Sequence, residues 1–137
     1  MKTINAEKKE FVALVNNIYK VQNLEGKSFA LKASKNLMLL QTALKDVEEK
    51  GTPSPEFLDL AKKVNEIANE NAEDSKERID KLEEENKELV ETRQAQLAEV
   101  TEMLKEELSV ELHMISEEEL PENITAQQLT GLQKILE

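Results

Sequence analysis

Few side chains in this chain are of the types that carry out acid–base, nucleophilic or metal chemistry. His113 is the only histidine and the chain contains no cysteine, so a Ser-His-Asp, Cys-His or zinc site would have at most one such member. Carboxylates are abundant in the runs 83–85, 106–107 and 117–119. Consecutive residues of a helix point in different directions, however, so these runs do not form chelating clusters. The residues therefore predict no catalytic site, no metal site and no cofactor.

Charge is distributed unevenly along the chain. The net charge is −11, and it divides into a balance of +3 over residues 1–50 and −14 over residues 51–137. Because contacts to phosphate require concentrated positive charge, we expect no direct binding to nucleic acid. An acidic surface of this kind either keeps a helical protein in solution or suits a basic protein partner.

Apolar residues recur at helical spacing through most of the chain. Aromatic residues make up only 3% of it, and there are three glycines and three prolines. A core must therefore be built from aliphatic side chains, as in helical hairpins and coiled coils. The sequence predicts a mainly α fold in one folding unit. We expect a helical hairpin, a long charged coiled-coil-like helix or helix pair, one short β-strand and a docked C-terminal helix.

The N-terminal segment, residues 1–51, is predicted to form the hairpin. Its apolar stripes indicate helices over 5–23 and 28–50. Asn5 and Ser28 are the expected N-caps of these helices, Gly26 is the expected turn residue between them, and Gly51 is expected to end the second helix. Because the connection between the two helices is short, they should pack antiparallel.

Residues 54–108 are predicted to form a charged helical segment. Ser54 as N-cap, followed by Pro55 at the first helical position, marks its start. Residues 69–78 are almost all polar. The sequence leaves open whether they continue the helix in solvent or interrupt it.

A short heptad pattern lies inside this charged segment. The positions with a and d spacing are Ile79, Leu82, Asn86 and Leu89. An asparagine at an a position fixes the register and number of strands at some cost in stability. The pattern lasts only about two heptads, so two interpretations stand. The helix packs on the hairpin of its own chain, or it forms a coiled coil that makes the protein a homo-oligomer.

Residues 109–137 are predicted to form an ordered docking unit that starts with a strand. Polar and apolar residues alternate over 109–115, and the apolar face consists of Val110, Leu112 and Met114. An unpaired strand exposes its backbone groups. Its partner is therefore either residues 2–4 or a segment of a second subunit.

A final helix is predicted over 126–136. Thr125 and Gln128 form a capping box at its start. A helix this short is marginal in water, so its inward residues must be buried on the strand, on the hairpin or on a partner. These residues are Leu129, Leu132 and Leu136.

Targeting and membrane signals are not found in the chain. No stretch approaches the length of a membrane span, and residues 1–5 lack the apolar run of a signal peptide. We therefore expect a cytoplasmic protein that does not bind membranes.

Two parts of the chain carry a resemblance to known proteins. The first comprises 4–7 and 31–37, and the second comprises 103–115, with 124–125 and 129–132 behind it. In these stretches the chain resembles small uncharacterised proteins of tailed bacteriophages and prophages. Such proteins have an N-terminal helical hairpin, a charged middle of variable length, an acidic strand and a short final helix. The resemblance implies a phage setting and brings no catalytic or binding residues with it.

Two classes of function follow as expectations. In the first, the chain is a non-enzymatic phage accessory protein that binds a host or defence protein in the host cytoplasm and inhibits it. In the second, it is a component of virion assembly or structure, such as a chaperone or connector, which self-associates through its helices. The partner is then a host protein in the first class and a phage protein in the second.

Overall fold

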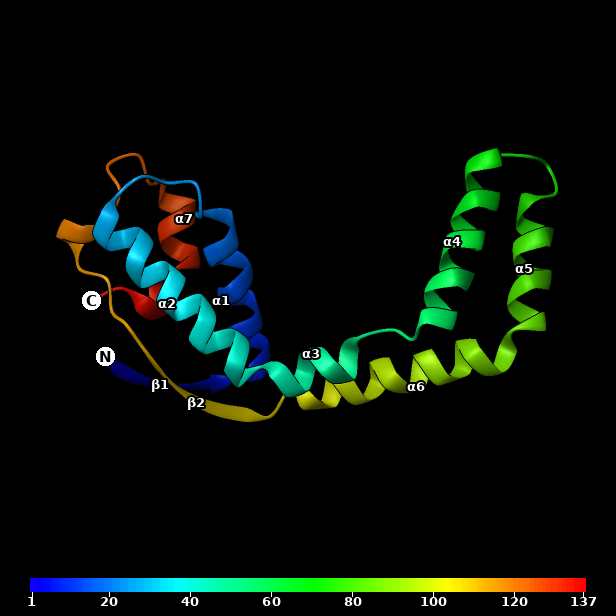
Figure 1. Cartoon of the computed structure of the whole chain (residues 1–137), viewed down its shortest axis with the longest axis horizontal. Helices are drawn as coiled ribbons and strands as arrows, with labels where there is room; N and C mark the ends of the chain where they lie inside the picture. The colour runs from blue at the N-terminus through cyan, green and yellow to red at the C-terminus, as the bar shows by residue number, and fades with distance from the viewer. The chain divides into compact units, whose positions relative to one another are not determined.

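A computed structural model describes all of residues 1–137. The chain forms seven α-helices and one two-stranded antiparallel sheet, which confirms the mainly α prediction. It divides into two compact units (Figure 1). Unit 1 consists of residues 1–47 and 102–137, and unit 2 of residues 48–101. These boundaries differ from the predicted segments because the two ends of the chain share one core.

A helical hairpin forms the body of unit 1. Helices α1 (Lys8–Lys20) and α2 (Lys27–Ala43) lie side by side (Figure 1). Gly26 has a φ of 134° where α2 begins, a backbone conformation that favours glycine. The N-cap of α2 is therefore Gly26 and not Ser28.

The first helix starts later than predicted because the chain before it is extended. Strand β1 (Lys2–Glu7) includes Asn5, so Asn5 is not an N-cap. The N-cap of α1 is Glu7, whose N–H donates to the Glu10 carboxylate at 2.9 Å.

The sheet joins the two ends of the chain. Strand β2 (Glu107–Leu112) pairs antiparallel with β1, and Ile4 lies opposite Val110. The predicted strand thus has residues 2–4 of its own chain as part of its partner. Its alternation, however, was predicted to reach residue 115 and ends at Leu112.

Beyond β2 the chain makes different contacts. Ile115 is buried, although the alternation placed it on the exposed face. Its N–H donates to Ile135 O at 2.7 Å, and its own carbonyl accepts from Glu137 N at 3.0 Å. The extended C-terminal residues therefore cover Ile115.

The last helix is also shorter than predicted. Helix α7 (Ala126–Gly131) is followed by a 3-10 turn at Gln133–Ile135. The backbone beyond this turn must be extended to bond Ile115, which ends the helix. The capping box at Thr125 is present, with Gln128 N donating to Thr125 Oγ1 at 3.2 Å.

The hydrophobic core lies entirely in unit 1. It joins both helices of the hairpin, both strands and the C-terminal turns. Its best-buried members are Phe11, Leu14, Ile18, Val21, Phe29, Leu40, Leu112, Ile115, Leu132 and Ile135.

The second predicted helix is interrupted near its end. It breaks at Leu44, and α3 (Lys45–Gly51) follows. The Asp46 carboxylate accepts the N–H of Val47 at 2.8 Å, which offers the backbone an alternative to the regular helical pattern.

Unit 2 is built from three further helices. Helices α4 (Pro55–Glu70) and α5 (Ser75–Glu85) form an antiparallel hairpin, and α6 (Lys87–Met103) follows (Figure 1). Ser54 caps α4 as predicted, because its hydroxyl accepts from Phe57 N at 3.2 Å. The open question of residues 69–78 is resolved as an interruption, since Asn71 adopts a left-handed conformation with a φ of 49°.

The heptad segment does not form one continuous helix. Asn86 is the C-cap of α5, and its side-chain amide donates to Leu82 O at 2.9 Å. The chain turns sharply there into α6 (Figure 1). The heptad spacing thus continues across a break between two helices.

Candidate functional site

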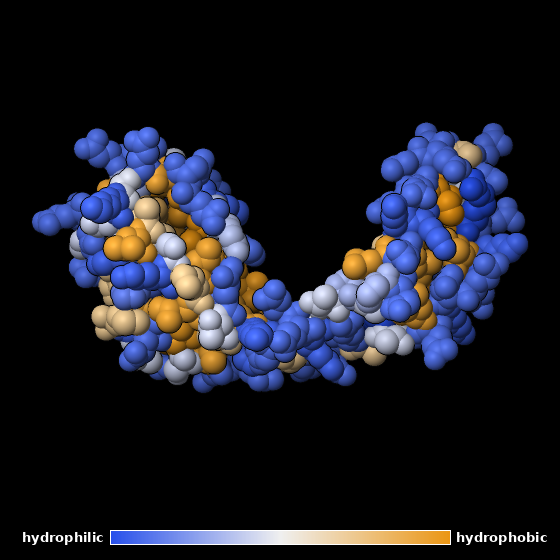
Figure 2. Space-filling model, in the orientation of Figure 1, coloured by the Kyte–Doolittle hydropathy of each residue, from blue (hydrophilic) through white to orange (hydrophobic).

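The outer face of α2 carries apolar side chains that unit 1 does not cover. Met38 is 65% exposed, Leu31 53% and Leu39 36%. Because residues seven and eight apart lie on neighbouring parts of a helix surface, these side chains form one stripe. Figure 2 shows apolar atoms reaching the surface over this helix. Contiguous exposed apolar patches mark interaction sites more often than isolated ones do.

The opposite face of α2 is anchored by a buried amide. The Asn36 side chain is fully buried; it donates to His113 O at 2.9 Å and accepts from His113 N at 2.7 Å. It therefore satisfies the backbone just beyond β2 as a neighbouring strand would. The outer face is thus carried by a helix whose position is fixed, which lowers the entropy cost of binding to it.

A lysine on α2 holds the turn after β2. Lys32 Nζ donates to Met114 O at 2.8 Å and to the Glu119 carboxylate at 2.7 Å. This ion pair is the main reason that the pKa of Glu119 falls to about 2, with further hydrogen bonds from the Ser116 N–H and hydroxyl. The 3-10 turn at Glu117–Glu119 begins with a capping box between Ser116 and Glu119.

The charge around the exposed stripe is positive. Helix α2 contains three lysines and no acidic residue, and Lys27 and Lys35 are exposed beside the stripe. At the α1 side, Tyr19 is 46% exposed, and its hydroxyl accepts from Gln41 Nε2 at 2.7 Å. In a chain of net charge −11, this face is therefore an apolar surface with a basic margin.

A second ion cluster, formed by one buried lysine and two exposed carboxylates, lies elsewhere in unit 1. Lys8 is only 7% exposed, and its Nζ contacts Asp46 Oδ2 at 2.9 Å and Glu106 Oε2 at 3.1 Å. The hydrogen bond to Asp46, then that to Glu106, raises the pKa of Lys8, and Lys8 lowers the pKa of Asp46. The cluster joins the start of α1 to the two chain segments that lead to and from unit 2.

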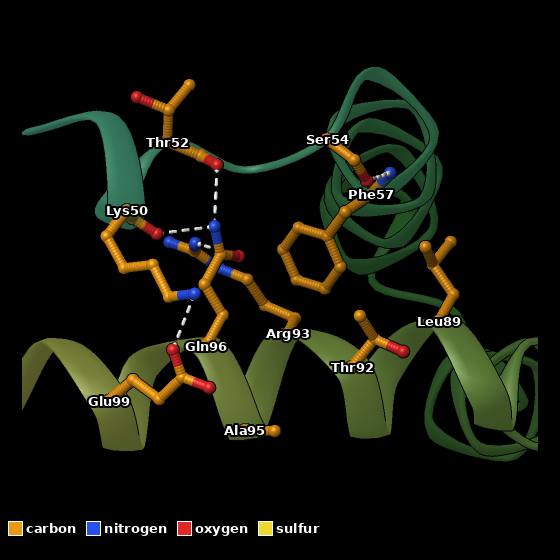
Figure 3. Close-up of a pocket in the computed structure, with 10 residues that line it drawn as sticks. All are labelled: Lys50, Thr52, Ser54, Phe57, Leu89, Thr92, Arg93, Ala95, Gln96 and Glu99. Atoms are coloured by element: carbon orange, nitrogen blue, oxygen red, sulfur yellow. Dashed lines mark hydrogen bonds and ion pairs between the residues drawn. The ribbon is translucent and has the colours of Figure 1, made fainter.

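Unit 2 contains a hollow of about 500 Å³ between the loop before α4 and helix α6 (Figure 3). The Arg93 guanidinium lies 5.7 Å from the centre of the Phe57 ring and donates to Gly51 O at 2.9 Å. Gln96 Nε2 donates to the carbonyls of Lys50 and Thr52. These polar groups bind the protein itself, so the hollow is best explained as the anchorage of the loop.

The predicted self-association residues lie in unit 2. Ile79 and Leu82 are half-buried on α5, Asn86 ends that helix, and Leu89 is half-buried on α6. The structure therefore brings the first two together on one helix face and separates Leu89 from them by the turn at Asn86.

The predicted docking residues lie in unit 1. Val110, Leu112 and Leu132 are buried in the core, and Leu136 packs against it. The remaining two, Met114 and Leu129, are half-buried. This C-terminal module thus packs on the hairpin of its own chain.

The outer face of α2 was missed by the sequence reasoning. The predicted stripe of this helix followed the core positions and left Leu31, Met38 and Leu39 aside. The sequence did contain a signal for this face, because α2 has more large apolar residues than one buried face needs.

Comparisons of the chain with models of protein families, with curated proteins and with solved structures gave no match. No helix combines the length and the apolar character needed to cross a membrane. No three His, Cys, Asp or Glu side chains gather in a way that could hold a metal ion.

Proposed function

We propose that the protein acts by binding another protein on the outer face of α2. The observation that carries this proposal is the exposed stripe of Leu31, Met38 and Leu39 on a helix whose other face is locked into the core. Three large apolar side chains on one exposed helix face favour association with a complementary surface. The same helix has no acidic residue.

The chemistry of this face favours an amphipathic helix with acidic margins as the partner element. Such a helix would place its apolar stripe on Leu31 and Met38 and its carboxylates near Lys27 and Lys35. A second copy of α2 suits the site less, because its lysines would face those of the first copy.

The resemblance to phage proteins supports a phage setting for this binding. We propose that the partner is a host or defence protein in the host cytoplasm and that occupation of its surface inhibits it. A role in virion assembly is the second candidate. It is favoured by the sparse burial in unit 2, which suits a unit that associates with copies of itself.

Substitution of the exposed stripe tests the proposed function. A tagged wild-type chain should capture a bacterial protein from lysate, and Leu31→Ser with Met38→Ser should abolish the capture without changing the fold, because both side chains are exposed. Leu58→Ser is a matched control, since Leu58 is also 53% exposed but lies on α4 of unit 2. Cross-linking from position 38 should then reach an acidic helix of the captured protein.

Two results would contradict the proposal. One is capture that the α2 substitutions leave intact. The other is capture that Leu58→Ser removes to the same extent, which would place the binding surface on unit 2 or reveal a general loss of fold.

A further inference from the structure

Unit 2 buries very little apolar surface for a unit of three helices. Only one of its apolar side chains, Leu60 at 6% exposure, is buried, and the core cluster contains none of its residues. Other apolar residues of the α4–α5 hairpin remain partly exposed: Phe57, Ala61, Val64, Ile67, Ile79 and Leu82. Two helices alone rarely bury enough surface to hold together, so this hairpin lacks covering elements.

Apart from Phe57, which lies against Arg93 of α6, these half-buried residues recur at the spacing of one helix face on each of the two helices. Figure 2 shows apolar atoms at the surface along this hairpin between hydrophilic margins. Ser75 closes one end, where its hydroxyl donates to Ile67 O at 3.2 Å. A second hairpin laid on this apolar face would complete a four-helix bundle, in which the apolar face of each helix points to the bundle centre.

The charges on α5 show which kind of hairpin fits. Charged residues flank the apolar face of α5, formed by Ile79 and Leu82, on both sides. We call these two sides the margins of the helix. The margin toward α4 is already used, because Arg78 pairs with Glu70 of that helix. The margin on the other side carries Lys76 and Glu83, seven residues apart.

Lys76 and Glu83 have no ion-pair partner in their own chain and are exposed. Lys76 lies near the start of α5 and Glu83 lies near its end. Two antiparallel copies of α5 would therefore place each lysine beside the glutamate of the other copy. In an antiparallel arrangement the positive end of each helix dipole also lies beside the negative end of the other, which is favourable.

We propose that two copies of the chain associate through their α4–α5 hairpins into an antiparallel four-helix bundle, in which Lys76 of each copy pairs with Glu83 of the other. The self-complementary margin selects a second copy over an unrelated protein. This interface is separate from the outer face of α2, so either surface can exist without the other.

Sedimentation velocity of the full-length protein tests the interface. At micromolar concentration and low ionic strength the wild type should sediment as a dimer of 15.6 kDa chains. Lys76→Glu and Glu83→Lys should each weaken the dimer by about tenfold, because two symmetry-related attractive pairs become repulsive. Both substitutions are exposed, so helicity by circular dichroism should stay at the wild-type level.

Mixing the variants gives the decisive measurement. Each single variant should be largely monomeric alone, but an equimolar mixture of Lys76→Glu with Glu83→Lys should dimerise, since every pair across the mixed interface is again attractive. The double variant should dimerise by itself for the same reason. Lys81→Glu is the control, because Lys81 lies on the outer side of α5, away from its apolar face.

Three outcomes would overturn the proposal. The first is a wild type that stays monomeric at all accessible concentrations. The second is a dimer that Lys76→Glu leaves unchanged, which would indicate a parallel α5 pair or another surface. The third is a dimer weakened equally by Leu31→Ser and Met38→Ser, which would place the second copy on α2.

Discussion

Glu119 illustrates how one side chain can hold several chain segments at once. Its carboxylate accepts from the Lys32 ammonium of α2 and from the N–H and hydroxyl of Ser116. These donors stabilise the charged form and lower the pKa from 4.5 to about 2. The interaction therefore stabilises the folded state only while the carboxylate is ionised.

The pH dependence of this contribution can be predicted. Because the folded pKa lies below the unfolded value, the stabilisation is complete above pH 4.5 and disappears as the pH falls toward about 2. Glu119→Gln should therefore lower the urea midpoint at pH 7 but leave it close to wild type near pH 2. Paired urea titrations across this range measure the difference.

Glu118→Gln provides the control for this pH experiment. Glu118 is the exposed neighbour in the same 3-10 turn, so it should leave the midpoint near wild type throughout. If the urea midpoints of the wild type and Glu119→Gln differ as much at pH 2 as at pH 7, the ionised Glu119 carboxylate is not the source of the stabilisation.

The burial of individual polar residues could not be predicted from the sequence. Lys8 and Asn36 are among the three buried polar residues of the chain, and neither stood out as a core residue. Their partners lie 38 and 98 residues away for Lys8 and 77 residues away for Asn36. Local periodicity contains no information about contacts of that separation.

At the scale of elements, capping signals were the most informative parts of the sequence. Ser54 and Thr125 start α4 and α7 where they were predicted to do so, because a cap involves only four adjacent residues. Helix ends at Leu44 and Asn86 were not predicted. Those ends depend on side chain–backbone bonds that compete with the helix and leave its apolar spacing intact.

Gly131 shows how tertiary packing changes the effect of a helix residue. Helical propensity alone makes glycine about 1 kcal/mol worse than alanine. In the structure, a Cβ at this position would lie 2.9 Å from Asn17 Cγ, and Asn17 Nδ2 donates to Gly131 O at 3.1 Å. The absence of a side chain thus permits the closest approach of α7 to α1.

A double-mutant cycle separates the two effects. Gly131→Ala should destabilise the wild type by about 1 kcal/mol, because Asn17 must move and its hydrogen bond weakens. An Asn17→Ala background removes Cγ and Nδ2 but leaves Cβ at 3.2 Å from the new side chain, so the same change should destabilise less there than in the wild type. Denaturant unfolding of the four proteins gives the coupling energy, and equal effects in both backgrounds would refute the steric explanation.

At the scale of the whole molecule, the two units differ in how much they bury. Unit 1 contains the entire core cluster, whereas unit 2 has one buried apolar side chain. Local stability follows buried apolar contacts. The free energy of opening should therefore be unequal along the chain.

Hydrogen exchange should detect this inequality directly. In dilute solution, where monomers prevail, amides of α4 and α5 should exchange before those of α1 and β2. At high concentration the α4–α5 amides should gain protection, because the proposed dimer would cover them. Uniform protection of both units in dilute solution would show that unit 2 is stable without a partner.

The Lys8 cluster has a consequence for how this chain can vary. A single ammonium group holds Asp46, just before the chain leaves unit 1, and Glu106, just after it returns. The exit and re-entry points are therefore neighbours, and residues 48–101 have the topology of an insertion in one turn of an otherwise continuous scaffold. Closing that turn costs little entropy whatever lies within it. Lengthening, shortening or exchanging the inserted helices would leave the scaffold's own contacts in place, so the two units are free to evolve at different rates.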